Sequence, residues 1–248
     1  MKTAIGGSRS VFLLWLLLLA VHTVAGQSAV EFEAANKLFE QGKFAEAAVG
    51  YERLLTNGPT AALHFNLGNA RFKSGQPGMA ILHYHHALAL APRDPDARGN
   101  LQFARRSLGV TVEESFGQHL LRRNTLDEWA WLAGGALGAW FLLLAVGEAR
   151  PERRAALASF TKGIGAVALV LGGLLGAVHW ERSATRAAVV VVREAPARPG
   201  PLAESKVTFS LRDGAEVTVL DVKDDWFHVR DTGQRSGWVK SAALRPLP

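Results

Sequence analysis

Two uncharged apolar segments constrain the fold of this 248-residue chain more than any other feature. The first, WAWLAGGALGAWFLLLAVG, covers Trp129–Gly147, and the second, GIGAVALVLGGLLGAVHW, covers Gly163–Trp180. Neither contains Asp, Glu, Lys or Arg. About 20 apolar residues in a helix are enough to cross the hydrocarbon layer of a bilayer. We therefore predict two transmembrane helices, at 129–147 and 163–180; a buried hairpin in a soluble protein is the alternative.

The residues between these segments, 148–162, carry an excess of positive charge: Arg150, Arg153, Arg154 and Lys162 against Glu148 and Glu152. Short loops rich in Lys and Arg remain in the cytoplasm. The sequence thus predicts a basic cytoplasmic loop over 148–162, with both flanking regions on the opposite side. Each predicted helix also has a Gly-x-x-x-Gly pair, Gly134 with Gly138 and Gly172 with Gly176. Such pairs let helices pack closely, within the hairpin or against a partner.

The N-terminus has the pattern of a secretory signal. Lys2 and Arg9 lie before and beside the apolar run Val11–Val21, and the small residues Ala25 and Gly26 follow. We predict a signal peptide over 1–26, cleaved after Ala25. An uncleaved anchor helix is the alternative. Both interpretations place the residues after Gly26 outside the cytoplasm.

Residues 27–108 contain an internal repeat with a period of 33 residues. The segment AANKLFEQGKFAEAAVGYERLLTNGP aligns with LGNARFKSGQPGMAILHYHHALALAP, and the matched pairs include Asn36/Asn69, Phe39/Phe72, Gly42/Gly75, Tyr51/Tyr84 and Pro59/Pro92. This pattern resembles the tetratricopeptide repeat (TPR), a helix–turn–helix unit of about 34 residues. The glycines fall where each unit turns, and a third partial copy, Gly99–Arg106, is predicted to cap the stack.

The TPR resemblance implies a concave groove lined by the first helix of each repeat and suited to an extended peptide. The positions carried over are Phe32, Asn36, Phe39, Phe65, Asn69, Phe72 and Lys73, with Arg106 as a second cation. Asn36 and Asn69 would hold a peptide backbone or carboxylate, and Lys73 and Arg106 would supply positive charge. The alternative is that all of these are packing and surface residues.

Three histidines, His83, His85 and His86, fall within four residues of the second repeat. His83 and His86 share a helix face at i, i+3 spacing. Metal sites in proteins use three or four ligands, and no third ligand or carboxylate stands nearby in the sequence. We favour a packed or solvated helix face over a metal site, and predict no metal and no cofactor.

Residues 181–248 change to short alternating strands after a Pro-rich connector, Ala195–Pro201. The turn signals are Arg212-Asp213-Gly214 and Asp231-Thr232-Gly233. The segments Gly214–Val219, Trp226–Val229 and Gly237-Trp238-Val239 resemble bacterial SH3 domains, which are small barrels. The resemblance implies a peptide groove at Trp226, with Trp238 in the core or at the rim. A core role for both tryptophans is the alternative.

Together these features predict a multidomain membrane protein with α-helical TPR repeats, two transmembrane helices and a C-terminal all-β SH3-like barrel. The order resembles the BatE group of the Bat (aerotolerance-type) operons, as does LDEWAWLAG before the first apolar segment. The resemblance implies a bacterial inner-membrane protein with periplasmic N- and C-terminal domains, working with von Willebrand-type membrane proteins and a MoxR-type ATPase.

The sequence contains no recognisable catalytic motif and no cysteine. Its net charge is +6, but Lys and Arg are scattered, which argues against nucleic-acid binding. The uncharged segments argue against a transport pathway. We predict a non-enzymatic scaffold for protein partners; a protein that binds peptidoglycan peptides is the alternative.

Overall fold

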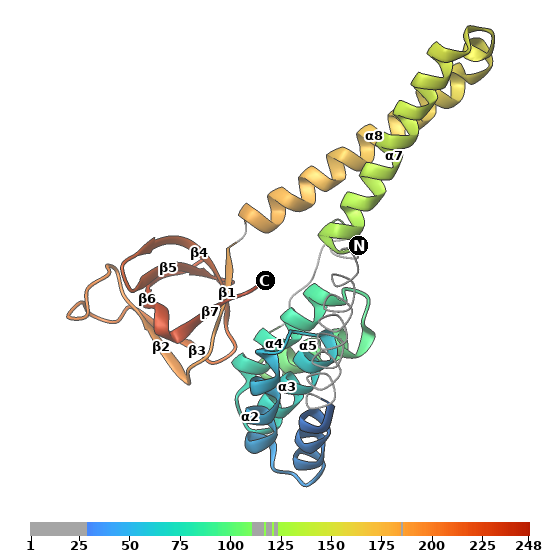
Figure 1. Cartoon of the computed structure of the whole chain (residues 1–248). Helices are drawn as coiled ribbons and strands as arrows, with labels where there is room; N and C mark the ends of the chain where they lie inside the picture. The colour runs from blue at the N-terminus through green and yellow to red at the C-terminus, as the bar shows by residue number, and fades with distance from the viewer. Residues whose placement is uncertain (1–28, 111–116, 118–120, 122–123, 185) are drawn as a thin grey trace, which may run out of the picture.

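The chain consists of a helical domain, a long helical hairpin and a strand-rich domain, as Figure 1 shows. The computed structural model describes residues 29–110, 117, 121, 124–184 and 186–248. The predicted signal peptide over 1–26 lies outside the described residues. So does much of 109–128, the irregular sequence between the repeats and the first apolar segment, which we predict to be a juxtamembrane segment. We call residues 29–108 the repeat domain and residues 187–248 the C-terminal domain.

The repeat domain is built from antiparallel helix pairs. A helix over residues 29–40 pairs with α2 (Phe44–Leu55), α3 (Ala61–Lys73) pairs with α4 (Pro77–Leu90), and α5 (Pro95–Ser107) begins a third copy. Gly42 and Gly75 have φ angles of 77° and 78°, a left-handed conformation that glycine adopts without strain. The turns predicted at these two glycines are therefore present.

Close helix contacts within the pairs depend on small residues. A Cβ placed on Gly68 of α3 would lie 2.7 Å from the Tyr84 ring of α4, so only glycine fits without a shift. Ala47 and Ala80, the matched small positions of the second helices, are completely buried. Tyr51 and Tyr84 fill the space between helices, each about 2% exposed. The residues that recur every 33 positions are thus the ones that pack the two helices of each unit together.

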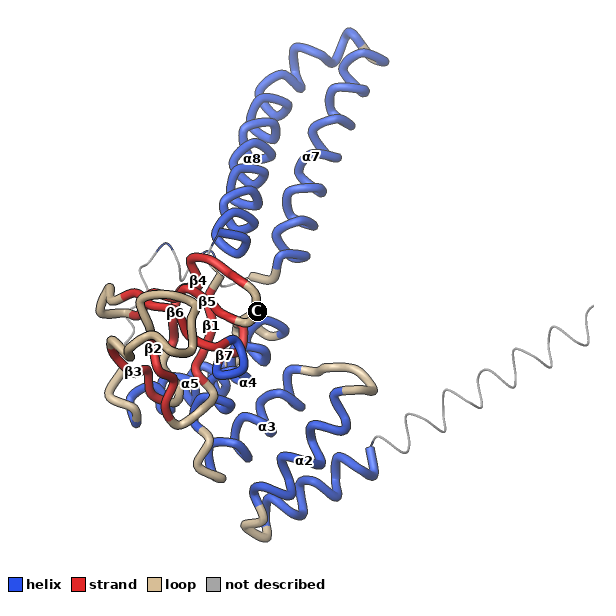
Figure 2. The backbone as a smooth tube through the Cα atoms, turned by 90° about the vertical axis from the view of Figure 1, so that its left-hand side faces the viewer, coloured by secondary structure: helices blue, strands red, loops and turns tan. Residues whose placement is uncertain are grey.

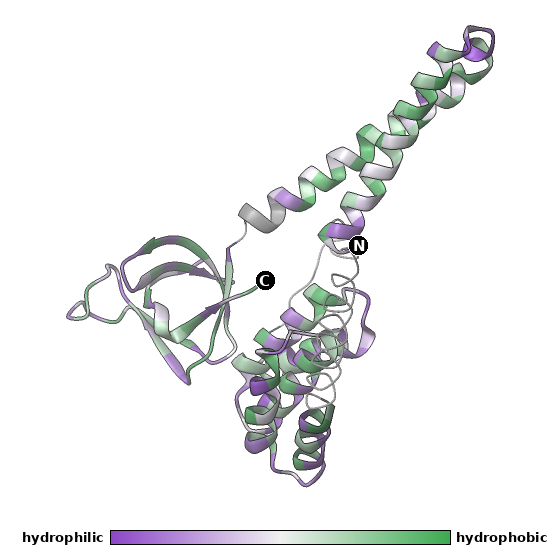
Figure 3. Ribbon diagram, in the orientation of Figure 1, coloured by the Kyte–Doolittle hydropathy of each residue, from purple (hydrophilic) through white to green (hydrophobic). Residues whose placement is uncertain are grey.

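Two long helices form the hairpin, α7 (Leu126–Ala149) and α8 (Pro151–Ala184). The expected loop over 148–162 is helical except around Arg150, so the turn is much tighter than predicted. Pro151 begins α8, where its missing N–H costs nothing, and the Ala-, Leu- and Arg-rich residues after it favour helix. Arg150, Arg153 and Arg154 lie at the tip of the hairpin, which is hydrophilic in Figure 3, whereas Lys162 lies further along α8.

The hairpin exposes its apolar side chains instead of burying them. Both helices are long and apolar enough to cross a membrane, and only 11% and 17% of their most apolar windows are buried. Trp131 is 82% exposed and Leu169 is 76% exposed. A core helix of a soluble protein would bury such residues. The two helices are therefore consistent with a membrane protein.

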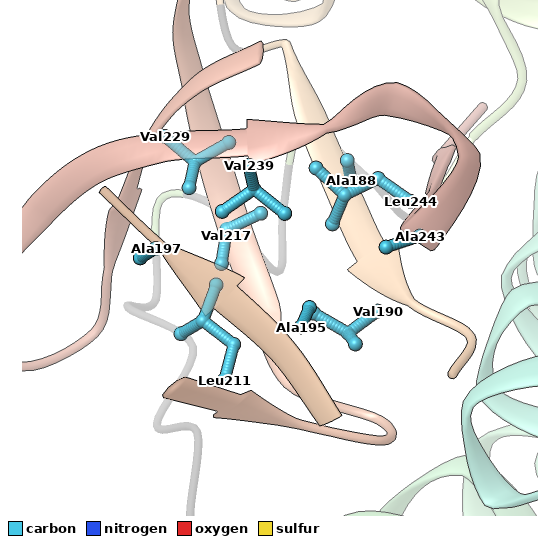
Figure 4. Packing of buried hydrophobic residues seen from close by; sticks show 10 residues of the cluster. All are labelled: Ala188, Val190, Ala195, Ala197, Leu211, Val217, Val229, Val239, Ala243 and Leu244. Carbon is cyan, nitrogen blue, oxygen red and sulfur yellow. The ribbon is translucent and has the colours of Figure 1, made fainter. Parts of the chain in front are cut away.

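The C-terminal domain has seven short strands: β1 (Ala187–Val190), β2 (Glu194–Ala197), β3 (Phe209–Arg212), β4 (Glu216–Lys223), β5 (Trp226–Asp231), β6 (Ser236–Lys240) and β7 (Leu244–Pro246). A single turn of 3-10 helix, Ser241–Ala243, precedes β7. One sheet has the order β6-β5-β4-β1-β7, and β2 pairs with β3 in a second sheet. Small and branched residues from both sheets, among them Ala188, Leu211 and Val229, form the core in Figure 4.

The predicted barrel is not closed. The two sheets meet at an isolated bridge between Arg198 and Trp238, beyond the end of β2. Pro199 and Pro201 follow this bridge, and proline has no N–H to donate to a ladder. The pairing of β2 with β6 therefore stops after one step, and the strands remain two packed sheets.

Candidate functional site

The two asparagines predicted to line the groove are hydrogen-bonded inside the repeats. Tyr51 Oη donates to Asn36 Oδ1 at 2.7 Å, and Tyr84 Oη donates to Asn69 Oδ1 at 2.8 Å. Asn100 Nδ2 also donates to Asn69 Oδ1, at 2.7 Å. The amide oxygens therefore join each first helix to its second helix. A ligand would reach Asn69 through its Nδ2.

The C-terminal ends of α3 and α5 carry an aromatic and basic surface. The rings of Phe72 and Phe103 meet edge to face, with centroids 5.5 Å apart, and Phe103 is 56% exposed. Lys73 and Arg106 are exposed beside them, and Arg106 shares a helix face with Phe103 at i, i+3 spacing. We call Phe72, Lys73, Phe103 and Arg106 the aromatic–basic patch.

The other predicted groove aromatic, Phe39, lies away from this patch at the N-terminal end of the domain. The centroids of the Phe39 and Phe44 rings are 5.1 Å apart in an edge-on arrangement. Phe39 also packs against the buried residues of the first helix pair. The structure thus brings Phe72, Lys73 and Arg106 to one end of the repeat domain, whereas Phe39 packs at the other end. Phe103, absent from the sequence prediction, completes the patch.

The chemistry of the patch suits an apolar side chain next to negative charge. The edge-to-face contact of Phe72 with Phe103 adds about 0.5–1.5 kcal/mol beyond area burial and leaves much of the Phe103 ring open to a ligand. Lys73 and Arg106, exposed at the same ends of α3 and α5, can each bind a carboxylate. An acidic segment that carries an apolar residue has both features.

The histidines of α4 separate into two environments. His83 is 6% exposed and its Nδ1 lies 3.2 Å from Nδ1 of His64, while His86 stacks on His64 with ring centroids 4.9 Å apart. His85 lies 3.3 Å from Glu216 of the C-terminal domain. Among the described residues, no group of three or more His, Asp or Glu side chains is placed to hold a metal ion.

Burial of the histidine cluster disfavours its protonation. Burial, with a smaller contribution from neighbouring histidines, lowers the pKa of His64 to about 4 and that of His83 to about 3. The two neutral rings can then share a proton, with one Nδ1 donating and the other accepting. The cluster is a packing feature between α3 and α4.

On the C-terminal domain, the outer face of β5 and β6 carries a row of aromatic and basic side chains. Trp226 pairs with Lys240, and His228 pairs with Trp238. Because alternate residues of a strand face the same side, all four share one face. The ring of His228 stacks on Trp238 with centroids 5.0 Å apart, and Lys240 Nζ lies 4.8 Å from the centre of the Trp226 ring.

The two tryptophans differ in exposure. Trp226, the one predicted to present a groove surface, is 5% exposed, whereas Trp238 is half-buried. Lys240 covers Trp226 and is itself held by Asp225, with Nζ 2.7 Å from the carboxylate. In this arrangement the His228–Trp238 stack is the accessible aromatic surface of the domain.

Two segments of the chain match known families. Residues 61–94 match the tetratricopeptide repeat, and residues 191–246 match the bacterial SH3 domain. No curated protein matches the chain. The chain therefore contains a TPR repeat and a bacterial SH3 domain, and both families are typically binding modules.

Sequence reasoning missed Phe103 and His228. Phe103 is a large apolar residue among the polar residues of RGNLQFARRS, a signal for an exposed aromatic residue on a helix. His228 stands two residues from Trp226 on an alternating strand, which places both on one face. The partner of His228 is a residue of the next strand, so only the register identifies the stack.

Proposed function

We propose that this protein is a non-enzymatic, membrane-anchored scaffold that binds extracytoplasmic segments of partner proteins. The aromatic–basic patch binds an acidic segment with an apolar side chain, and the His228–Trp238 surface binds an extended chain. The hairpin of α7 and α8 holds both surfaces close to the bilayer. The observation that carries the proposal is the presence of two accessible aromatic surfaces, one exposed and one half-buried, on domains joined by an apolar hairpin.

The direction of the hairpin supports a common location for both domains. The repeat domain precedes α7, and the C-terminal domain follows α8, so both lie at the same end of the hairpin (Figure 1). Two crossings return the chain to the side from which it started. With the basic tip in the cytoplasm, both domains are periplasmic in this proposal.

We extend the proposal to a Bat-type complex in a bacterial inner membrane. The order of predicted signal peptide, repeats, hairpin and SH3 domain supports this, together with the LDEWAWLAG sequence. The partners are then von Willebrand-type membrane proteins, and their periplasmic segments are the ligands.

Crosslinked co-purification from membranes tests the scaffold function. The variants are Phe103→Ala and Trp238→Ala, each compared with an exposed apolar residue in the same domain, Val49→Ala and Val222→Ala respectively. We expect each site variant to lose a different partner while its control retains the wild-type set. An unchanged partner set in both site variants would falsify the assignment of ligands to these surfaces. The earlier candidates Asn69 and Trp226 are poorer targets, because their replacement also disturbs packing.

The second candidate function is binding of peptidoglycan peptides by the C-terminal domain. The match to the bacterial SH3 family supports it, since that family includes cell-wall-binding roles. Sedimentation with purified sacculi tests it. Wild-type protein should sediment and Trp238→Ala should remain in solution; wild-type protein that stays in the supernatant excludes this function.

A further inference from the structure

One hydrophobic cluster contains residues of both the repeat domain and the C-terminal domain. Val189 of β1 is completely buried in a cluster with Ile81 of α4 and with Leu101 and Ala104 of α5. Val191, Leu108 and Leu247 pack around the same cluster. In Figure 2 the C-terminal domain lies next to the α4–α5 end of the repeats, and β1 is the strand that contacts α4. The apolar face at this end of the repeats is thus covered by another domain and not by solvent.

A buried ion pair crosses the same contact. Arg105 of α5 is 7% exposed, and its Nε and one terminal nitrogen donate to the two carboxylate oxygens of Glu216 at 2.6 and 2.8 Å. His85 of α4 lies 3.3 Å from the same carboxylate. A bidentate pair of this kind has defined geometry and therefore fixes orientation. It selects one way of docking the two domains.

The backbones of the two domains also approach each other closely at this contact. Gly78 N, in the first turn of α4, donates to Asp213 Oδ1 at 3.1 Å. A methyl group on Gly78 would overlap the carbonyl oxygen of Val190 and the carboxylate of Asp213, and a methyl group on Gly214 would overlap Leu108. Glycine is needed at position 78 because the backbone of β1 approaches so closely, and at position 214 because its φ angle of 79° is left-handed.

We propose that the SH3-type domain is the structural cap of the repeat stack at its α4–α5 end. The two domains then form one rigid extracytoplasmic body instead of two modules that move independently. Repeat stacks need a terminal element that covers their last apolar face, and α5 alone leaves Leu101 and Ala104 to be covered. The cap is supplied from 80 residues further along the chain, through the membrane hairpin.

This inference restricts where the C-terminal domain can bind a ligand. Strand β1, the turn at Asp213 and Gly214, and Leu247 are used by the contact. The His228–Trp238 surface on β5 and β6 remains, together with the aromatic–basic patch on the repeats. The docking of the two domains does not depend on which partners the protein binds.

Hydrogen exchange on the full chain in detergent micelles tests the cap. Gly78→Ala is compared with Gly99→Ala, the same substitution in α5 at a position where a Cβ meets nothing within 4 Å. We expect Gly78→Ala to reduce the protection of amides in α5 and β1 by about tenfold or more, because overlap at a packed contact forces the domains apart. Gly99→Ala should keep or raise protection, since alanine favours helix over glycine.

A second variant tests the docking through the ion pair of Arg105 with Glu216, so it involves no overlap of backbone atoms. Glu216→Gln leaves Arg105 buried without its counter-charge, so protection of α5 and β1 should fall, whereas Arg105→Met combined with Glu216→Leu should recover most of it. Amides of α2, far from the contact, should be unaffected in every variant. If Gly78→Ala behaves like Gly99→Ala, or Glu216→Gln changes β1 but not α5, the domains are not docked in solution and the proposal is wrong.

Discussion

At the residue scale, a single hydrogen bond type recurs with the period of the repeat. Asn36 with Tyr51 and Asn69 with Tyr84 make the same contact 33 residues apart. The asparagine side chain joins the two helices of each unit. This arrangement places a structural requirement and a candidate binding position on the same residue.

Removal of one tyrosine hydroxyl should therefore weaken the fold. Tyr84→Phe leaves Asn69 without its buried donor from α4, and we expect a loss of about 1 kcal/mol in the free energy of unfolding. Urea denaturation of the purified protein measures it. Tyr51→Phe should lose at least as much, because Asn69 Oδ1 keeps a second donor, Asn100 Nδ2, when Tyr84 is changed. No loss in either variant would show that these bonds do not hold the helices together.

The buried histidines should make the repeat domain sensitive to mild acid. Between pH 7 and pH 5 the unfolded chain takes up protons at the ordinary histidine pKa of 6.5, whereas His64 and His83 remain neutral down to about 4 and 3. The unfolded state binds more protons in this window, so stability falls as the pH falls, by about 2 kcal/mol for each such imidazole at pH 5.

Thermal unfolding at pH 7 and pH 5 measures this dependence. His83→Gln should flatten it. An identical pH dependence in the wild type and in His83→Gln would contradict the assignment to the cluster.

At the element scale, one glycine of α8 packs closely against α7, whereas the glycines of the two Gly-x-x-x-Gly pairs have no such close neighbour. A Cβ on Gly165 of α8 would lie 2.7 Å from Trp140 Nε1 of α7. By contrast, Gly134, Gly138, Gly172 and Gly176, the members of the two Gly-x-x-x-Gly pairs, have nothing within 4 Å of such a position. The pairs therefore make no close contact between α7 and α8, although Gly134 and Gly172 line a cavity between the two helices.

This difference predicts opposite effects of the same substitution. Gly165→Val should separate the helices at Trp140 and lower the unfolding temperature in detergent by several degrees, since overpacking costs about 1–3 kcal/mol. Gly138→Val should be tolerated by the hairpin. Equal destabilisation by both would mean that Gly138 also lies at a helix contact in the membrane.

At the scale of the whole molecule, the covered α4–α5 face requires both domains on one side of the bilayer. The chain has no cysteine, so single cysteines report location directly. Gln102→Cys and Lys206→Cys, both exposed, should react with a membrane-impermeant maleimide in intact cells. Ala156→Cys, near the hairpin tip, should react only after the membrane is opened. Labelling of one domain cysteine but not the other would overturn the common location.

Much of this architecture follows from the sequence because its signals are local. The helix turns at Gly42 and Gly75 depend on one residue each, the 33-residue period on matched positions, and the hairpin on runs of apolar residues. Strand alternation likewise predicted the β-rich C-terminal region. These features arise from interactions between residues close in the chain, so pattern alone identifies them.

The tertiary structure decided how these parts meet. Phe72 joins Phe103 across two helices, His228 joins Trp238 through strand register, and Arg105 joins Glu216 across 111 residues of chain. In the tertiary structure the two β sheets also do not close into a barrel. The side-chain oxygens of the two asparagines accept hydrogen bonds within the repeats. No periodicity encodes such contacts, because they depend on which surfaces exclude water together once the elements have formed. The sequence by itself determined the elements and their order, and packing determined which of their side chains became surfaces for binding.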